Sequence, residues 1–165
     1  MERCCKALRD DVCFFTGHRI MSTDPITAGK LLSAAIVDVI NLGVKEFISG
    51  GAKGFDMLAS EAVMKLFNEY PDIRLRLYLP CKEYNRAWEN DSKDRMKRIL
   101  DFACDVKYIS DKTYRPGCMQ RRNAEMVNDA KYCIAWYDNK KGGTQSTLKL
   151  AKKKNCIIRN LAIEI

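Results

Sequence analysis

Residues 49–56 read Ser-Gly-Gly-Ala-Lys-Gly-Phe-Asp, and these residue types at this spacing could hold an anion. A short apolar run precedes them, and a helix-like pattern begins at Phe55. Glycines let the backbone approach an anion closely, and the first N–H groups of a helix have no intrahelical partner. The stretch therefore predicts a phosphate-binding turn, although a plain strand-to-helix turn uses the same residues. The residues expected to contact the ligand here are Ser49, Gly50, Gly51, Gly54, Phe55 and Asp56.

A second glycine turn lies near the other end of the chain, where Gly142, Gly143 and Thr144 precede another helix-like pattern. Taken alone, it also fits a plain turn with Thr144 as the helix N-cap. Two such turns at one edge of a sheet suit a phosphate on one turn and a second anionic or polar group on the other. Together they favour a ligand site.

A third group of candidates is Thr16-Gly17-His18-Arg19, which follows an apolar run. The guanidinium of Arg19 has the geometry to grip a phosphate or carboxylate, but a surface arginine is the alternative. His18 is the only histidine of the chain and could act as a base, as a hydrogen-bond donor or as a capping residue. We expect all four residues to border the ligand.

Further candidates lie after other expected strands. Arg122 and Asn123 fall near the start of a helix, where a cation is disfavoured by the helix dipole unless an anion is close. Pro80 opens a loop that reaches Trp88. Tyr137 and Trp88 could stack on a base ring, or they could simply pack in the core.

Asp56 and Glu61 are the candidate catalytic carboxylates. Asp56 falls at a helix N-terminus, where it could cap the helix, bind ribose hydroxyls or take part in catalysis. Glu61 lies ~140° round the helix from Asp56 at about 100° per residue, so the two need not act together.

The elements that would position these residues are strands alternating with helices. This order predicts an α/β fold with a doubly wound, mostly parallel sheet and helices on both faces. Ligands bind such sheets at the carboxyl ends of the strands, where the strand order reverses. The expected strands are 11–16, 46–49, 73–79, 106–109, 132–137 and 156–159, with 161–165 as a further short strand or a tail; the expected helices are 25–42, 55–70, 92–102, 119–130 and 144–154.

Composition limits the function classes. The 165 residues suit a single domain, 1–165, and no apolar run approaches the ~20 residues of a membrane span. The N-terminus lacks a signal peptide pattern, so we expect a cytoplasmic protein. Eight cysteines without a C-x-x-C pair, and one histidine, argue against a zinc site, and we expect neither a metal nor a cofactor. The net charge of +8 attracts phosphorylated ligands and nucleic acid alike.

The motifs at residues 16–19, 49–56, 122–123 and 142–144 together resemble the YpsA-like branch of the SLOG superfamily. That superfamily includes the DNA-processing protein DprA and the LOG cytokinin-activating phosphoribohydrolases. The resemblance implies a Rossmann-like fold and a nucleotide site formed by these turns. LOG enzymes carry a glutamate soon after their second glycine motif, whereas residues 142–149 hold no acidic residue, which leaves Asp56 or Glu61 to supply a carboxylate.

Three hypotheses follow. The first is a module that binds a nucleotide or nucleotide-derived small molecule as a sensor, carrier or sequestering protein. The alternative is a phosphoribohydrolase that cleaves the N-glycosidic bond of a nucleoside 5′-monophosphate. The weakest is single-stranded DNA binding, because no stripe of aromatic residues interleaves with the basic ones. The identity of the ligand and the formation of a homo-oligomer are left open.

Overall fold

The computed structural model describes residues 9–111 and 113–165. It forms one six-stranded sheet with the strand order β4-β3-β2-β1-β5-β6. Every neighbouring pair of these strands is parallel, which confirms the predicted α/β fold. The strands are β1 (Val12–Gly17), β2 (Glu46–Ser49), β3 (Arg74–Leu79), β4 (Asp105–Tyr108), β5 (Tyr132–Trp136) and β6 (Ile157–Asn160).

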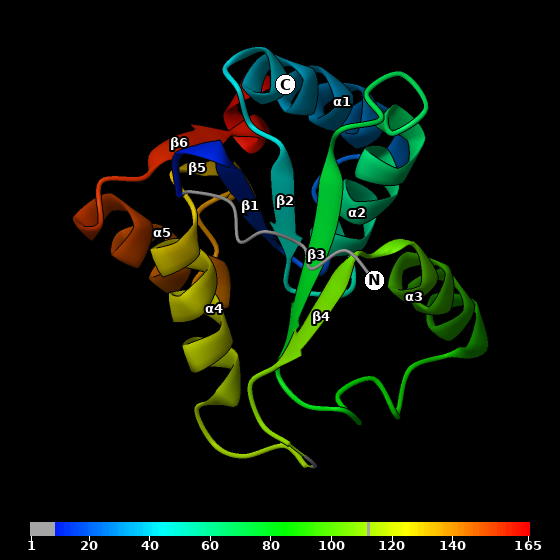
Figure 1. Cartoon of the computed structure of the whole chain (residues 1–165). Coiled ribbons are helices and arrows are strands. Elements are labelled where there is room, and N and C mark those ends of the chain that lie inside the picture. The colour runs from blue at the N-terminus through cyan, green and yellow to red at the C-terminus, as the bar shows by residue number, and fades with distance from the viewer. Residues whose placement is uncertain (1–8, 112) are drawn as a thin grey trace.

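Helices cover both faces of the sheet, as expected. Figure 1 shows the first three α-helices on one face and the last two on the other. The helices are α1 (Pro25–Asn41), α2 (Phe55–Leu66), α3 (Asn90–Phe102), α4 (Cys118–Asp129) and α5 (Gly143–Lys153), with short 3₁₀ helices η1 (Arg9–Asp11) and η2 (Leu161–Glu164).

Two hydrophobic cores lie on the two faces. Because side chains alternate along a strand, Phe15 joins the core under α1 and α2, whereas its neighbour Phe14 joins the core under α4 and α5. β1, β2 and β5 are buried almost throughout, as parallel strands covered on both sides are.

The predicted start of α1 is correct, whereas the end of α2 and the form of the last residues differ from the prediction. α1 begins as predicted, because the side chain of Asp24 accepts a hydrogen bond from the backbone N–H of Thr27 at 2.9 Å. α2 ends at Leu66 rather than near residue 70, and a turn follows in which the Tyr70 N–H donates to the carbonyl of Leu66. Residues 161–164 form a 3₁₀ helix rather than a strand, because the Asn160 side chain caps them at Ala162.

In the strand expected at 73–79, apolar and polar residues alternate. This strand was therefore expected either to have one face that is less buried than in the other strands or to lie towards an edge of the sheet. In the structure β3 lies one strand in from the edge, and the short, mostly exposed β4 is the edge strand. The expectation about the N-terminal residues falls outside the described part of the chain. Among the described residues, no helix is both long and apolar enough to cross a membrane.

Candidate functional site

A cleft of about 740 Å³ opens at the carboxyl ends of β1 and β5. The chain adds β2, β3 and β4 on one side of β1 and then returns to place β5 on the other side, so the strand order reverses here. Crevices at such reversal points are the usual ligand sites of doubly wound sheets. The cleft therefore lies where the sequence placed a site.

Ten of the predicted site residues line this cleft. They come from the end of β1, the start of α2, α4 and the start of α5, which lie far apart in the sequence but meet here. The residues are Thr16, Gly17, His18, Arg19, Asp56, Arg122, Asn123, Gly142, Gly143 and Thr144.

The other predicted residues do not line the cleft. They either form the turn beneath the cleft or lie elsewhere in the fold. These residues are Ser49, Gly50, Gly51, Gly54, Phe55, Glu61, Pro80 and Tyr137.

The turn before α5 is open to the cleft. The helix begins at Gly143 after the N-cap residue Gly142, and the first intrahelical bond runs from the N–H of Ser146 to the carbonyl of Gly142. A Cβ added at Gly142 or Gly143 would meet no atom within 4 Å. The helix N-terminus therefore presents N–H groups and a positive dipole end to unfilled space, as an anion site requires.

The glycine turn before α2 is closed, in contrast to the expectation that it cradles a phosphate. Two of its N–H groups already donate within the chain: that of Gly51 to the Ser49 hydroxyl at 3.2 Å, and that of Ala52 to the Asp56 carboxylate at 3.3 Å. Its carbonyls are also used, because Arg122 donates to Gly50 and the Tyr84 hydroxyl donates to Gly51 at 3.0 Å. This turn forms the floor beneath the cleft.

Asp56 and Arg122 are a buried, oppositely charged pair at that floor, each 6% exposed. A Cβ on Gly50 would lie 2.9 Å from Nη1 of Arg122 and 3.0 Å from Oδ2 of Asp56, so only glycine leaves room for both. Burial raises the pKa of Asp56 to about 6, against the opposing effect of the Arg122 charge and the Ala52 N–H. The site thus contains a carboxyl group that titrates near neutral pH.

This carboxyl group gives a testable pH dependence of stability. Because the folded pKa of Asp56, about 6, lies above the ordinary 3.8, the folded state binds the proton more tightly than the unfolded state between these values. The contribution of Asp56 to the free energy of unfolding is therefore fully present below about pH 4 and is lost as pH rises through about 6. We expect Asp56→Asn to gain about 1–3 kcal/mol relative to wild type across this window, measured by urea unfolding.

The control for this measurement is Asp72→Asn, which changes an exposed carboxylate. Its stability difference from wild type is expected to stay constant across the same window. If the stability difference from wild type were independent of pH for both variants, the pKa of Asp56 would not be raised in the folded protein.

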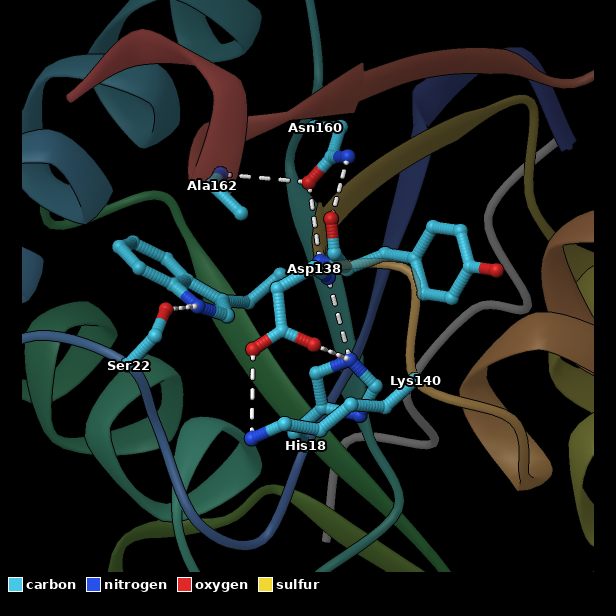
Figure 2. Close-up of polar contacts among 8 residues, drawn as sticks. His18, Ser22, Asp138, Lys140, Asn160 and Ala162 are labelled. Atoms are coloured by element: carbon cyan, nitrogen blue, oxygen red, sulfur yellow. Dashed lines mark hydrogen bonds and ion pairs between the residues drawn. The ribbon is translucent and has the colours of Figure 1, made fainter.

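The segment that follows β5 is tied to the ends of β6 and β1 by polar contacts drawn in Figure 2. The Asn160 side chain pairs with both backbone groups of Tyr137, at 2.9 and 2.8 Å. Just beyond, Oδ1 of Asp138 lies 2.9 Å from Nε2 of His18, and Oδ2 lies 3.4 Å from the ammonium of Lys140. His18 thus reaches the cleft from a position fixed by its neighbour strand.

Glu61 and Trp88 have structural partners elsewhere. Glu61 pairs with Arg95 of α3, with Nε at 3.1 Å, so of the two candidate catalytic carboxylates only Asp56 borders the cleft. Trp88 packs edge-on against Tyr84 at 5.4 Å, which fits the core-packing alternative rather than base stacking in the cleft.

Some cleft residues were not anticipated. Met119 and Met126 of α4 give the cleft an apolar wall, and Lys141 adds a cation beside the open glycine turn. Methionines on a helix look like ordinary core residues in a sequence, so only Lys141, next to Gly142, carried a usable signal. Within residues 9–111 and 113–165, no three His, Cys, Asp or Glu side chains gather in a way that could hold a metal ion.

Comparison with known proteins gives a consistent result. The model of the YspA SLOG family matches residues 26–163. The SPbeta prophage-derived protein YoqJ of Bacillus subtilis (strain 168) is 35% identical over 136 residues, which cover 75% of this chain and 79% of that protein. A UPF0398 protein of Bacillus thuringiensis (strain Al Hakam) is 27% identical over 132 residues, covering 79% and 72%.

Two solved structures share the fold. DNA processing protein A from Helicobacter pylori, described for its single-stranded DNA binding mode, has a TM-score of 0.65 at 20% identity over 89% of this chain. DprA from Streptococcus pneumoniae has a TM-score of 0.63 at 13% identity over 88%. This chain spans only 63% and 48% of those two chains, so the likeness concerns one part of each.

Proposed function

This chain belongs to the YspA SLOG family, and we propose that its cleft binds a nucleotide or nucleotide-derived small molecule, as a sensor, carrier or sequestering protein. The observation that carries the proposal is the open N-terminus of α5, which faces a cleft of about 740 Å³. That volume lies within the range of small-molecule sites, ~300–1,000 Å³. Five free cysteines suit a function in the reducing cytoplasm, namely Cys13, Cys81, Cys118, Cys133 and Cys156.

The lining of the cleft suggests how such a ligand lies. A phosphate fits the N–H groups of Gly143 and Thr144, with the Lys141 ammonium nearby. Asp56 and Arg122 at the floor are suited to ribose hydroxyls, because one accepts and the other donates hydrogen bonds. The apolar wall formed by Met119 and Met126 leaves surface for a base.

The test is a charge placed at the α5 N-terminus. Gly143 is exposed and a Cβ there meets nothing, so Gly143→Asp is expected to fold, with helix stability unchanged or raised by about 0.3–1 kcal/mol. The new carboxylate would occupy the anion site and repel phosphate. We expect at least a tenfold loss of affinity for AMP by calorimetry, about 1.4 kcal/mol.

Gly143→Asn is the matched control, because it has the shape of aspartate without the charge. It is expected to keep most of the affinity. An equal loss in both variants would indicate a steric effect, and unchanged AMP binding by Gly143→Asp would place the phosphate elsewhere. Absence of binding for a panel of monophosphates, diphosphates and cyclic nucleotides would reject the proposal itself.

One observation favours an enzyme as the second candidate. Asp56 borders the cleft and has a pKa of about 6. A carboxyl group with such a pKa can protonate the leaving base or stabilise the transition state when an N-glycosidic bond is cleaved. α5 carries no acidic residue, so Asp56 would act alone. Release of free base from AMP, lost in Asp56→Asn, would favour phosphoribohydrolase activity over simple binding.

Single-stranded DNA is the third candidate. It draws on the net charge of +8 and on the DNA-binding description of the Helicobacter pylori neighbour. It predicts oligonucleotide affinity that falls steeply with salt. Oligonucleotide binding that Gly143→Asp weakens in parallel with AMP binding would indicate that both ligands use the cleft.

A further inference from the structure

One nitrogen atom in the cleft wall has two competing partners. Nε2 of His18 lies 3.2 Å from the backbone nitrogen of Asp138 and 2.9 Å from Oδ1 of the same residue. Without a proton, Nε2 accepts a hydrogen bond from the backbone N–H; with a proton, it donates to the carboxylate. The two bonds exclude each other, because they need opposite states of the same nitrogen.

The carboxylate favours the protonated state. Oδ1 of Asp138 is buried and has no hydrogen-bond partner when Nε2 is bare. A buried acceptor without a donor is costly. Because the Asp138 N–H donates to Nε2, the neutral ring holds its proton on Nδ1, so a second proton on Nε2 both gives Oδ1 its donor and charges the ring. The backbone N–H of Asp138 favours the other state. Figure 2 shows both contacts converging on the imidazole.

We propose that His18 and Asp138 form a proton switch that couples anion binding in the cleft to pH, with Asp138 as the positioning residue. This inference rests on the proposed nucleotide site. Proton uptake by His18 adds a positive charge to the cleft wall, where the phosphate is expected. The affinity for an anion therefore rises as pH falls and His18 becomes charged.

The location suits such a coupling. Asn160 holds both backbone groups of Tyr137, so a change of contacts at the next residue, Asp138, begins directly after this fixed point. From there the chain leads directly into the open turn at Gly142. The change of partner at His18 thus acts on the segment that carries the anion site.

The other charged and titratable groups around His18 are accounted for. Lys140 pairs with Oδ2 of Asp138 and opposes a charge on His18, while the Tyr137 ring lies 5.8 Å from the imidazole. Arg19 and Lys141 also line the cleft, with Asp56 and Arg122 at its floor. Burial works to raise the pKa of Asp138, but His18 and Lys140 hold it below the ordinary value, so Asp138 remains a carboxylate that can accept from Nε2.

The first experiment follows the imidazole itself. His18 is the only histidine, so its signal in the NMR spectrum of the full chain is unambiguous. Asp138→Asn is expected to change the pH dependence of this signal, because the carboxylate that accepts from protonated Nε2 is gone. Asp101→Asn, which alters an exposed carboxylate on α3, is expected to leave it unchanged. The same pH dependence of the signal in wild type and Asp138→Asn would overturn the switch.

The second experiment measures coupling with sulfate, because a phosphate monoester itself titrates near pH 6 whereas sulfate does not. Wild type is expected to bind sulfate about tenfold more tightly at about pH 5.5 than at about pH 8. His18→Gln keeps a donor towards Asp138 but cannot gain charge, so only the smaller change due to Asp56 is expected to remain. An equal pH effect in both proteins would overturn the coupling alone. Absence of sulfate binding at both pH values, with no nucleotide binding either, would remove the proposed site and the coupling together.

Discussion

Replacing Arg122 with methionine is expected to lower the free energy of unfolding by about 3–5 kcal/mol at neutral pH, because it leaves the Gly50 carbonyl without its donor and the buried Asp56 without the nearby positive charge. Arg122 is 6% exposed, and its guanidinium donates to the carbonyl of Gly50 and, at 2.7 Å, to the side chain of Asn123. Methionine has a similar length, so little volume is lost. The cost comes from a carbonyl without its donor and from Asp56, which keeps a buried charge without a cation beside it.

The same reasoning makes this loss depend on pH. With Arg122 gone, the pKa of Asp56 rises further, because the Arg122 charge is the largest influence holding it down. Protonation of Asp56 then relieves the buried charge, so the loss is expected to be smaller at about pH 5 than at about pH 8. The double variant Arg122→Met with Asp56→Asn is expected to recover part of the loss at high pH.

Arg121→Met provides the matched control, because Arg121 is the exposed neighbour on the same helix. Its change in unfolding free energy is expected to stay within about 0.5 kcal/mol. Urea unfolding of all four proteins at both pH values tests the scheme. Similar, small losses for Arg121→Met and Arg122→Met would mean that Arg122 does not support the floor of the cleft.

The fold was predictable because its elements follow from local patterns. Apolar runs such as residues 132–136 leave little choice but a buried strand, and Asp24 followed by Pro25 marks a helix start by its own chemistry. The ends of elements that were predicted wrongly depend on short turns and on caps from neighbouring residues. η2 forms because Asn160 caps it at Ala162, and the sequence of residues 161–164 alone shows no such preference.

The site was predictable only in part. The rule that ligands bind at the carboxyl edge of a doubly wound sheet placed residues 16–19 and 142–144 together, and the structure does bring them to one cleft. The similar glycine pattern in residues 49–56 reaches the cleft only at Ala52 and Asp56, and two carbonyls of this turn accept hydrogen bonds from Arg122 and Tyr84, far along the chain. Asp138 was not recognised, because an aspartate in a turn is common and its contact with His18 spans 120 residues.

Gly54 shows how closely this turn is built against the residues of the cleft. It has φ 77° and ψ −121°, a conformation that side-chain-bearing residues rarely adopt. A Cβ there would also lie 2.2 Å from the carbonyl oxygen of Arg19, which is backbone and cannot simply rotate away. The close approach is what lets the N–H of Phe55 donate to the carbonyl of His18 at 3.2 Å.

Gly54→Ala is therefore expected to lower the free energy of unfolding by about 2–5 kcal/mol, the sum of backbone strain and overpacking. Gly29→Ala is the control: Gly29 lies inside α1, a Cβ there meets nothing within 4 Å, and the change is expected to stabilise by about 0.5–1 kcal/mol. Because relief of the clash must push residues 17–19 outward, the NMR signal of His18 should shift in Gly54→Ala and stay in place in Gly29→Ala. A Gly54→Ala protein with wild-type stability and an unmoved His18 signal would mean that the glycine turn is not the support that holds His18 and Arg19 at the cleft.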